Sequence, residues 1–446
     1  MKQRIIPIPK HLITIPMIRY SKLVSLLCAL LFASALFAQS NGSNSPYSRY
    51  GFGMLNDGAG GFNKGMAGLS YGMRNGRDIN TSNPASYSAI DSLSFIFDTG
   101  FSIQNGNFKN ETAGTNARNT SFDYLTAGFR LAPGLGMSLG MLPYSSIGYS
   151  IKHNQAVSNE NLIQTETYSG NGGLHEVYIG LGWAPVKRLS AGFNIGYLWG
   201  NLEHKGSIAF NEAGANSSLL FYESDVRTYK ADFGLQYVQP LNKDNSLTLG
   251  LTYGLGHNIK SKANYYRQTI ANNKVSAGDS LTCSDAYQLP HTFGAGLVWQ
   301  HKDNLRVGAD YSYQKWADVK APVFDGTDYV SRTGLFTDRH KFTVGAEYIP
   351  DLNGTKWRHY IRYRAGFSYT SPYTLVDGRD GPRNYSVSLG VGLPIINFLN
   401  KGSVVNISAQ YERVEPQMAG MITENYFRLC IGLTFNEQWF MKWKVN

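Results

Sequence analysis

Apolar and polar residues alternate along most of the chain with a period of two. In the segment YFRLCIGLTF, residues 426–435, the apolar side chains share one face and polar or small residues occupy the other. The segments LTLGLTYGL, residues 247–255, and YSVSLGVGL, residues 385–393, repeat this pattern. Strict alternation over about ten residues, with an apolar outer face, is typical of a transmembrane β-strand.

Fourteen such segments follow one another from residue 93 onward. Their predicted limits are 93–104, 119–131, 134–150, 174–185, 188–203, 222–239, 246–268, 288–300, 305–318, 339–349, 357–370, 383–394, 403–414 and 425–435. An even number of strands suits a closed bacterial barrel. The sequence therefore predicts an all-β protein, a transmembrane antiparallel β-barrel of about 14 strands.

The connections between these segments alternate in length. APGL, APVKR, HKDN and PDLNGTK are short, whereas residues 151–173, 204–221 and 270–287 are long and polar. This alternation predicts short periplasmic turns and long outside loops, with both termini periplasmic and the protein in the outer membrane of a Gram-negative cell. A soluble propeller or sandwich would also have many short strands, but it explains neither the alternation nor the glycines on the inner faces.

The first residues predict a secretory signal peptide. Residues 1–38 carry five basic residues and no acidic one, and they include the apolar run LVSLLCALLFASALF before AQS. Met17 begins a conventional leader, and we expect cleavage after Ala38. Cleavage there removes five of the ten net positive charges and leaves +5, so the charge gives no case for nucleic-acid binding. Leu27 stands where a lipoprotein signal before Cys28 would need a small residue.

Residues 39–92 predict a plug inside the barrel, because GFGMLNDGAGGFNKGMAGLSYG is glycine-rich and lacks the strand period. The tract GAGGFNKG is no phosphate loop, since Met66 stands where the motif needs Lys. A turn at Asn83, Pro84 and Ala85, followed by Asp91, leads into the first strand. The predicted organisation is thus signal peptide 1–38, hatch 39–92, barrel 93–435 and a periplasmic tail 436–446.

These features resemble the FadL (OmpP1/FadL/TodX) family of outer-membrane transporters for hydrophobic compounds. The resemblance is carried by residues 58–76, by Asn83 to Asp91 and by the strand count, and NSPYSRYGFG and NEQWFMKWKVN resemble members from Bacteroidetes. The acidic pair often found before N-P-A is replaced here by GRDINTS. The resemblance implies a hatch in the lumen and a kinked third strand that opens the barrel wall sideways.

The third predicted strand contains Pro143, whose missing N–H and fixed φ would interrupt the ladder. With Tyr144 and Gly148, it forms the candidate lateral gate that the resemblance implies. The alternative is that Pro143 lies just above the bilayer, where the strand becomes loop.

Charged side chains recur on the faces that are predicted to point inward. The candidate polar lumen residues are Arg130, Glu176, Asp232, Asp310, Glu347, Arg362, Arg364 and Arg428. Both signs occur, so these charges indicate pairing with one another or with the plug more than a single-sign ion filter.

The sequence gives little support for catalysis. The nine histidines show no metal-ligand spacing, and DGRDG, residues 377–381, lacks the acidic positions of an EF-hand. We therefore expect no enzyme activity, no cofactor and no metal, although His291 or His340 beside a Ser leaves a barrel hydrolase as a minor alternative.

Two functions remain. The first is an uptake channel for hydrophobic or amphipathic small molecules, which bind in the lumen and leave laterally. The second is a non-transporting subunit of an outer-membrane secretion or assembly complex. The expected partners of the protein are outer-membrane lipids and, for the second function, other outer-membrane proteins that bind the loops or the C-terminal segment WFMKWK.

Overall fold

The computed structural model describes residues 43–111, 113–157, 162–212, 214–271, 274–352, 354, 356–395 and 402–438. The predicted signal peptide and the WFMKWK segment lie outside these residues. No helix in the described part of the chain is long and apolar enough to cross a membrane. The described residues also contain no group of His, Cys, Asp and Glu that could hold a metal ion.

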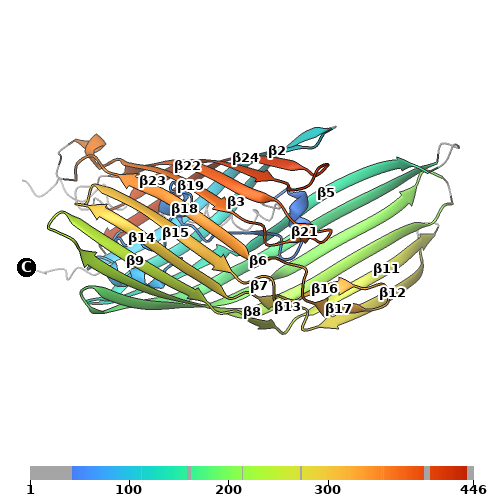
Figure 1. Cartoon of the computed structure of the whole chain (residues 1–446), viewed down its shortest axis with the longest axis horizontal. Helices are drawn as coiled ribbons and strands as arrows, with labels where there is room; N and C mark the ends of the chain where they lie inside the picture. The colour runs from blue at the N-terminus through green and yellow to red at the C-terminus, as the bar shows by residue number, and fades with distance from the viewer. Residues whose placement is uncertain are drawn as a thin grey trace, which may run out of the picture. The chain divides into compact units, whose positions relative to one another are not determined.

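Fourteen antiparallel spans close into a ring (Figure 1). The third span consists of two strands, β4 and β5, and strands β10 to β13 extend the seventh and eighth spans. The strands of the wall are β2 (Ser94–Lys109), β3 (Gly114–Ala132), β4 (Leu135–Pro143), β5 (Ser145–Ala156), β6 (Ile163–Val186), β7 (Leu189–Phe210), β8 (Ser217–Pro240), β9 (Asn245–Gly254), β10 (His257–Ile259), β11 (Lys262–Ala271), β12 (Lys274–Ser284), β13 (Tyr287–Leu289), β14 (Thr292–His301), β15 (Leu305–Gln314), β18 (Arg339–Tyr348), β19 (Arg362–Thr370), β22 (Arg383–Pro394), β23 (Val404–Glu415) and β24 (Thr423–Gln438).

The ring closes where β24 pairs with β2. Phe97 lies opposite Phe435 and Gly106 lies opposite Tyr426 in this ladder. Smaller elements lie in the connections, namely β16 (Ala321–Phe324), β17 (Tyr329–Arg332), η3 (Trp357–Tyr360), β20 (Leu375–Val376) and β21 (Arg379–Asp380). The predicted all-β barrel is confirmed, because each span has a neighbour on both sides and no free edge remains at the level of the apolar band.

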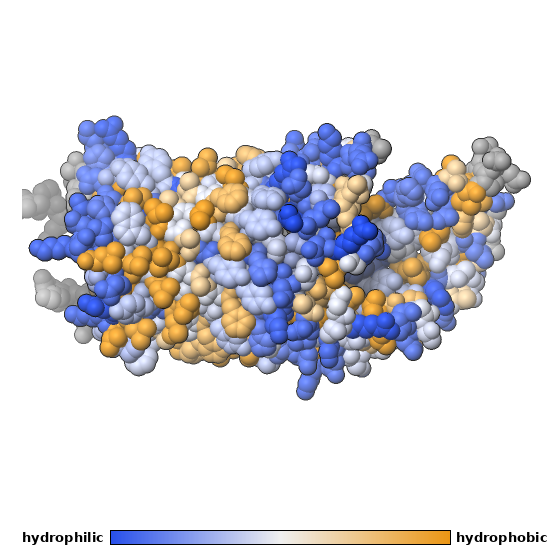
Figure 2. Space-filling view, viewed as in Figure 1, coloured by the Kyte–Doolittle hydropathy of each residue, from blue (hydrophilic) through white to orange (hydrophobic). Residues whose placement is uncertain are grey.

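The outer face of the barrel is apolar and the inner face is polar. Exposed side chains on the outer face include Ile179, Ile195, Phe233, Leu251, Leu297, Val344, Phe367, Leu389 and Ile431. Figure 2 shows hydrophobic side chains gathered over β9, β14 and β15. An apolar outer band is what a barrel needs to face lipid hydrocarbon.

Several strands continue well beyond this band. β6, β7 and β8 are 24, 22 and 24 residues long, and with β5, β11 and β12 they form an extension at the end of the barrel away from the short turns (Figure 1). The prediction of long loops at 151–173, 204–221 and 270–287 is therefore wrong for most of their length. These segments lack the sustained alternation that marks a membrane strand although the backbone pairs, and side chains such as Tyr168, Leu220 and Leu281 pack against an apolar cluster.

The hatch residues lie inside the ring. They contain η1 (Pro46–Arg49), β1 (Met54–Leu55), α2 (Gly61–Lys64) and η2 (Pro84–Ala89). Glycines on the inner face make room for the hatch backbone. A Cβ atom on Gly192 would collide with Pro84, and one on Gly366 would collide with Met66. The glycine-rich strands are therefore shaped to accept a plug.

Candidate functional site

The N-P-A turn anchors the hatch against β8. Asn83 caps η2, since its Oδ1 accepts a hydrogen bond from the Ala85 N–H at 3.2 Å. Its Nδ2 donates to the carbonyl oxygens of Tyr71 at 2.8 Å and Leu235 at 3.3 Å. One buried side chain thus connects the turn, another part of the hatch and the barrel wall. Asp91 lies at the surface, where it forms a 3.5 Å ion pair with Arg77.

Buried ion pairs fix the lower part of the hatch. Arg362 pairs with Asp78 of the hatch at 2.9 Å, and Glu347 accepts hydrogen bonds from Arg364 and Arg306, both at 2.7 Å. A buried charge is tolerated only with such partners, because desolvation of an unpaired ion costs several kcal/mol. These pairs connect the hatch to β19 and join β19 to β15 and β18.

Asp310 holds the hatch through backbone groups. Its Oδ2 accepts hydrogen bonds from the N–H groups of Ser70 at 2.6 Å and Tyr71 at 2.9 Å. Arg130 differs from the other predicted lumen residues. It lies near the end of β3, half-buried, and donates to the Ala132 carbonyl at 3.1 Å.

Residues 43–58 form a segment that crosses the barrel interior, which we name the strap. Ser45 donates to Glu424 of β24 at 2.8 Å, and Asn44 donates to Asn119 of β3 at 3.0 Å. Further along, Phe52 is fully buried in an apolar cluster with Ile147 and Trp316. The strap therefore connects walls that lie on different sides of the barrel.

The strap ends at a charged latch on β18. Asp57 forms ion pairs with Lys341 at 2.6 Å and Arg339 at 3.3 Å. Burial alone would raise the pKa of the Asp57 carboxyl, but Lys341 and Arg339 outweigh this effect and hold the pKa below its ordinary value. The latch is therefore ionised at neutral pH.

The barrel wall changes at Pro143. β3 pairs with β4 only from Leu125, opposite Met141, to the end with the short turns. Beyond Pro143 the third span stays paired with β6, since the Tyr144 N–H donates to the Leu174 carbonyl at 2.8 Å. No described residue of β5 pairs with β3. The two strands diverge in Figure 1, and the described wall has no ladder between them.

The opposing strand β6 bends at the same level. Pro143 pairs with His175 whereas Ile147 pairs with Gly172, so the register shifts by one residue. Gly172 and Gly173 have φ of 118° and 140°, values that L-residues rarely adopt. The kink is therefore supported by two strands, and the glycines of β6 are as much a part of it as Pro143.

Two cavities meet at the strap. One of about 190 Å³ contains Tyr144, Glu176, Lys230 and Asp232 in its lining, and the other has a volume of about 260 Å³. Their shared lining residues are Asn56, Asp57, Gly68, Pro143 and Arg339. The strap thus separates two chambers that both reach Pro143.

The first chamber holds a three-membered charge cluster. The Lys230 ammonium forms ion pairs with Glu176, at 3.2 Å, and with Asp232. The cluster brings one basic and two acidic side chains together, and Tyr144 lines the same chamber. A ligand in this chamber would meet both polar and aromatic surface.

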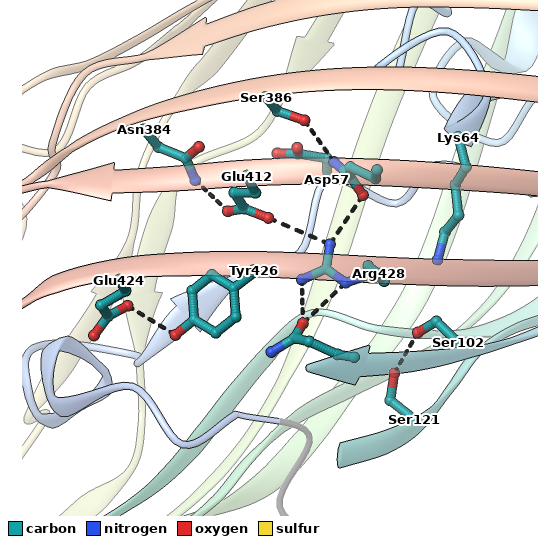
Figure 3. A network of polar contacts seen from close by, with 12 residues as sticks. Asp57, Lys64, Ser102, Ser121, Asn384, Ser386, Glu412, Glu424, Tyr426 and Arg428 are labelled. Carbon is teal, nitrogen blue, oxygen red and sulfur yellow. Dashed lines mark hydrogen bonds and ion pairs between the residues drawn. The ribbon is translucent and has the colours of Figure 1, made fainter. Parts of the chain in front are cut away.

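The second chamber has a polar wall built on Arg428 (Figure 3). The guanidinium donates to Gln104 at 2.6 and 2.9 Å and to Gln410 at 3.1 Å, and it lies 3.4 Å from Glu412. Asn384 donates to the same Glu412 carboxylate. Side chains from β2 and β23 thus surround one cation of β24, and Asn384 of β22 bonds one of them, Glu412.

A family model described as BamG matches residues 17–446. The chain belongs to the BamG family. No curated protein matches it.

The fold of this BamG-family chain is similar to the solved structures of FadL-type transporters. The Ralstonia pickettii toluene transporter TbuX has a TM-score of 0.59 at 15% identity, covering 85% of this chain and 98% of its own. The Pseudomonas putida toluene transporter TodX has a TM-score of 0.58 at 14% identity, covering 85% of this chain and 98% of its own. A Pseudomonas aeruginosa FadL homologue has a TM-score of 0.57 at 13% identity, with the same coverage. At such identities the likeness shows the fold, and the expected FadL-like architecture is confirmed.

The predicted site residues lie in different parts of the barrel interior. Pro143 and Tyr144 border the chambers, and Gly148 contacts the strap. Glu176, Asp232 and Arg428 line a chamber, whereas Glu347, Arg362 and Arg364 lie in the ionic layer below. Sequence reasoning missed the latch of Asp57, Arg339 and Lys341, because only the fold brings these distant residues together.

Proposed function

We propose that this BamG-family protein is an outer-membrane uptake channel for an amphipathic or hydrophobic small molecule. Both termini would lie on the periplasmic side, with the short turns, and the extension of β5 to β8 would lie outside. The molecule would bind in the chambers and leave sideways between β3 and β5. The observation that carries this proposal is that both chambers reach Pro143, where the wall pairing with β3 has already ended.

The linings favour an amphipathic ligand. Tyr144 and Leu289 offer apolar surface in the first chamber, and Lys230 with its two carboxylates offers a polar end. Each chamber is smaller than the roughly 300 Å³ of an ordinary ligand pocket. Passage of a larger molecule therefore requires the strap to move, which would join the chambers. The names of TbuX and TodX as toluene transporters support a small apolar substrate.

A disulfide lock tests this route. Met54 and Ser146 are cross-strand partners in β1 and β5, so Met54→Cys with Ser146→Cys would fix the strap over the opening. The background would carry Cys283→Ala and Cys430→Ala. A control pair, Ser246→Cys with Gln300→Cys, links β9 and β14 away from the strap.

Cells with each pair would be tested for uptake of radiolabelled toluene and decanoate. We expect the strap lock to abolish uptake when oxidised and to restore it on reduction, with no effect of the control pair. Uptake that persists through the oxidised lock would disprove release beside Pro143. Uptake equal to that of cells without the protein, for both probes, would reject a channel for these two classes.

The second candidate function is a non-transporting subunit of an outer-membrane protein complex. It is favoured by the ionic layer of Arg362, Asp78, Arg364 and Glu347, which secures the hatch. Native mass spectrometry of the protein extracted from its own membrane distinguishes the two functions. A bound small molecule supports the channel, whereas stoichiometric protein partners around an empty lumen support the subunit.

A further inference from the structure

One edge of β5 is only partly covered. β5 pairs with β6 from Ile147 to Ala156. On its other side, β1 pairs with Ser145 and Ser146, and the Ser48 hydroxyl bonds Gly148. No described strand pairs with that side of β5 beyond Gly148. The hatch therefore covers the beginning of the edge and leaves its outer half open.

The open half presents backbone groups in a regular row. The Gly148 N–H donates to Ser48 at 3.2 Å, so this residue points its backbone away from β6. Alternate residues of a strand point the same way, and Ser150, Lys152 and Asn154 therefore direct their N–H and C=O groups to the open side. All three residues are exposed. An unpaired row of this kind is a template for strand pairing.

No described strand pairs with the facing edge of β3 over residues 114–122. β3 pairs with β2 along residues 114–122 but with β4 only from Leu125 onward. Two edges thus border the same opening, beyond the apolar band. Closure of a barrel normally removes such edges, so two unpaired strand edges beside one gap are unusual and suggest a binding role.

The charged residues beside the opening indicate which kind of molecule could bind there. Arg118 on β3 and Lys152 and His153 on β5 are exposed. Neither residues 114–122 of β3 nor β5 contains an acidic residue. The rim of the opening is therefore basic and polar, which suits a segment with Asp or Glu side chains better than an apolar molecule.

We propose that the open edge of β5, residues 150–156, binds an acidic, extended segment of a second polypeptide as an added β-strand. The protein's own strand β1 already pairs with the same edge, and the partner strand continues this pairing outward. Main-chain hydrogen bonds give the affinity, and the basic side chains select the segment. The inference stands apart from the channel function, because it needs no passage through the lumen.

Photocrosslinking in cells tests the proposal. The crosslinking residue p-benzoylphenylalanine would replace Asn154 at the edge and, as a control, Lys205, which is exposed on β7 between two paired strands. Adducts would be digested, and the crosslinked peptides identified by mass spectrometry. We expect an adduct from position 154 that maps to an acidic segment of another protein, and none at 205.

A backbone variant separates strand pairing from simple proximity. Lys152→Pro removes an N–H that points to the open side and leaves the bonds to β6 intact, whereas Lys152→Ala keeps the N–H. We expect Lys152→Pro to lower the adduct yield roughly tenfold, from the lost hydrogen bond and the ring clash, and Lys152→Ala to lower it roughly twofold. Heat-modified mobility on gels would verify that each variant folds.

Several results would overturn the proposal. They are an adduct only to β3 of the same chain, an adduct only to lipid, and equal yields for Lys152→Pro and Lys152→Ala in folded protein. The absence of any adduct at position 154 would overturn it as well. Failure of the disulfide lock to block uptake would leave this inference untouched, so the two proposals fail separately.

Discussion

Asp57 and Lys341, separated by 284 residues in sequence, form an ion pair of 2.6 Å inside the barrel. The pair connects the end of the strap to β18, and Arg339 joins it at 3.3 Å. The same carboxylate lines both chambers. This latch therefore holds in place the segment that separates them.

Removal of the latch charge should loosen the strap. In Asp57→Asn, two cations lose their partner, and we expect a cost of about 1 kcal/mol, or roughly fivefold faster amide exchange in residues 43–58. Hydrogen–deuterium exchange measures this directly. Asp91→Asn, which removes an exposed ion pair outside the strap, should leave strap exchange unchanged. Equal exchange in Asp57→Asn and the native protein would refute the latch.

The latch should also respond to acid. A carboxyl whose pKa is lowered in the folded state stabilises that state fully above its unfolded pKa, and the contribution disappears as pH falls through the folded value. After division by the intrinsic, pH-dependent exchange rate, we expect constant protection factors in the strap from pH 8 to 5 and lower protection only below the ordinary Asp pKa of about 4. The Asp57→Asn variant should not show this change at low pH, because it has no carboxylate at position 57. A transition between pH 5 and 7 would show that another group controls the strap.

The inner-face glycines should be intolerant of side chains. In Gly366→Val, the new atoms would collide with Met66, and overpacking of this kind costs about 1–3 kcal/mol. The neighbouring Ala365 faces outward, so Ala365→Val supplies a matched control. Limited proteolysis of the hatch should be faster in Gly366→Val alone. The hatch would not be seated as described if both variants behaved alike.

The ionic layer should be far more sensitive than surface pairs. Glu347→Gln leaves Arg364 and Arg306 without their carboxylate, and breaking such a buried pair costs about 3–5 kcal/mol. The exposed pair of Arg267 and Asp279 gives the comparison, since solvent screens it and Asp279→Asn should change the free energy of unfolding little. Urea unfolding in detergent measures both. Similar losses for the two variants would contradict the burial argument.

The membrane part of the fold could be predicted because lipid imposes a rule on every strand. The outer face must be apolar and the backbone must pair, so the period of two is visible around Leu429 and Ile431. The extension of β6 to β8 escaped prediction, since its outer face is not held to an apolar band and its inner face packs against apolar residues only in places. Residues such as Tyr168 and Leu220 belong to strands there without any alternation around them.

Some residues of the candidate site could be predicted from local sequence and others could not. Pro143 marks a break in hydrogen bonding by its own covalent structure, so its position could be inferred locally. Arg428 is an inward charge in a strand whose face was already known. The partners of Asp57 could not be inferred, because a single carboxylate in a glycine-rich segment gives no sign of which distant cation it meets.

By itself, the sequence determined the barrel, its strand count and the presence of a polar interior with an N-terminal plug, because each follows from local periodicity and composition. The tertiary structure alone decided which charges pair, how the strap divides the interior into two chambers and that β6 shifts its register opposite Pro143. These properties depend on register and ring closure, which bring together residues hundreds of positions apart.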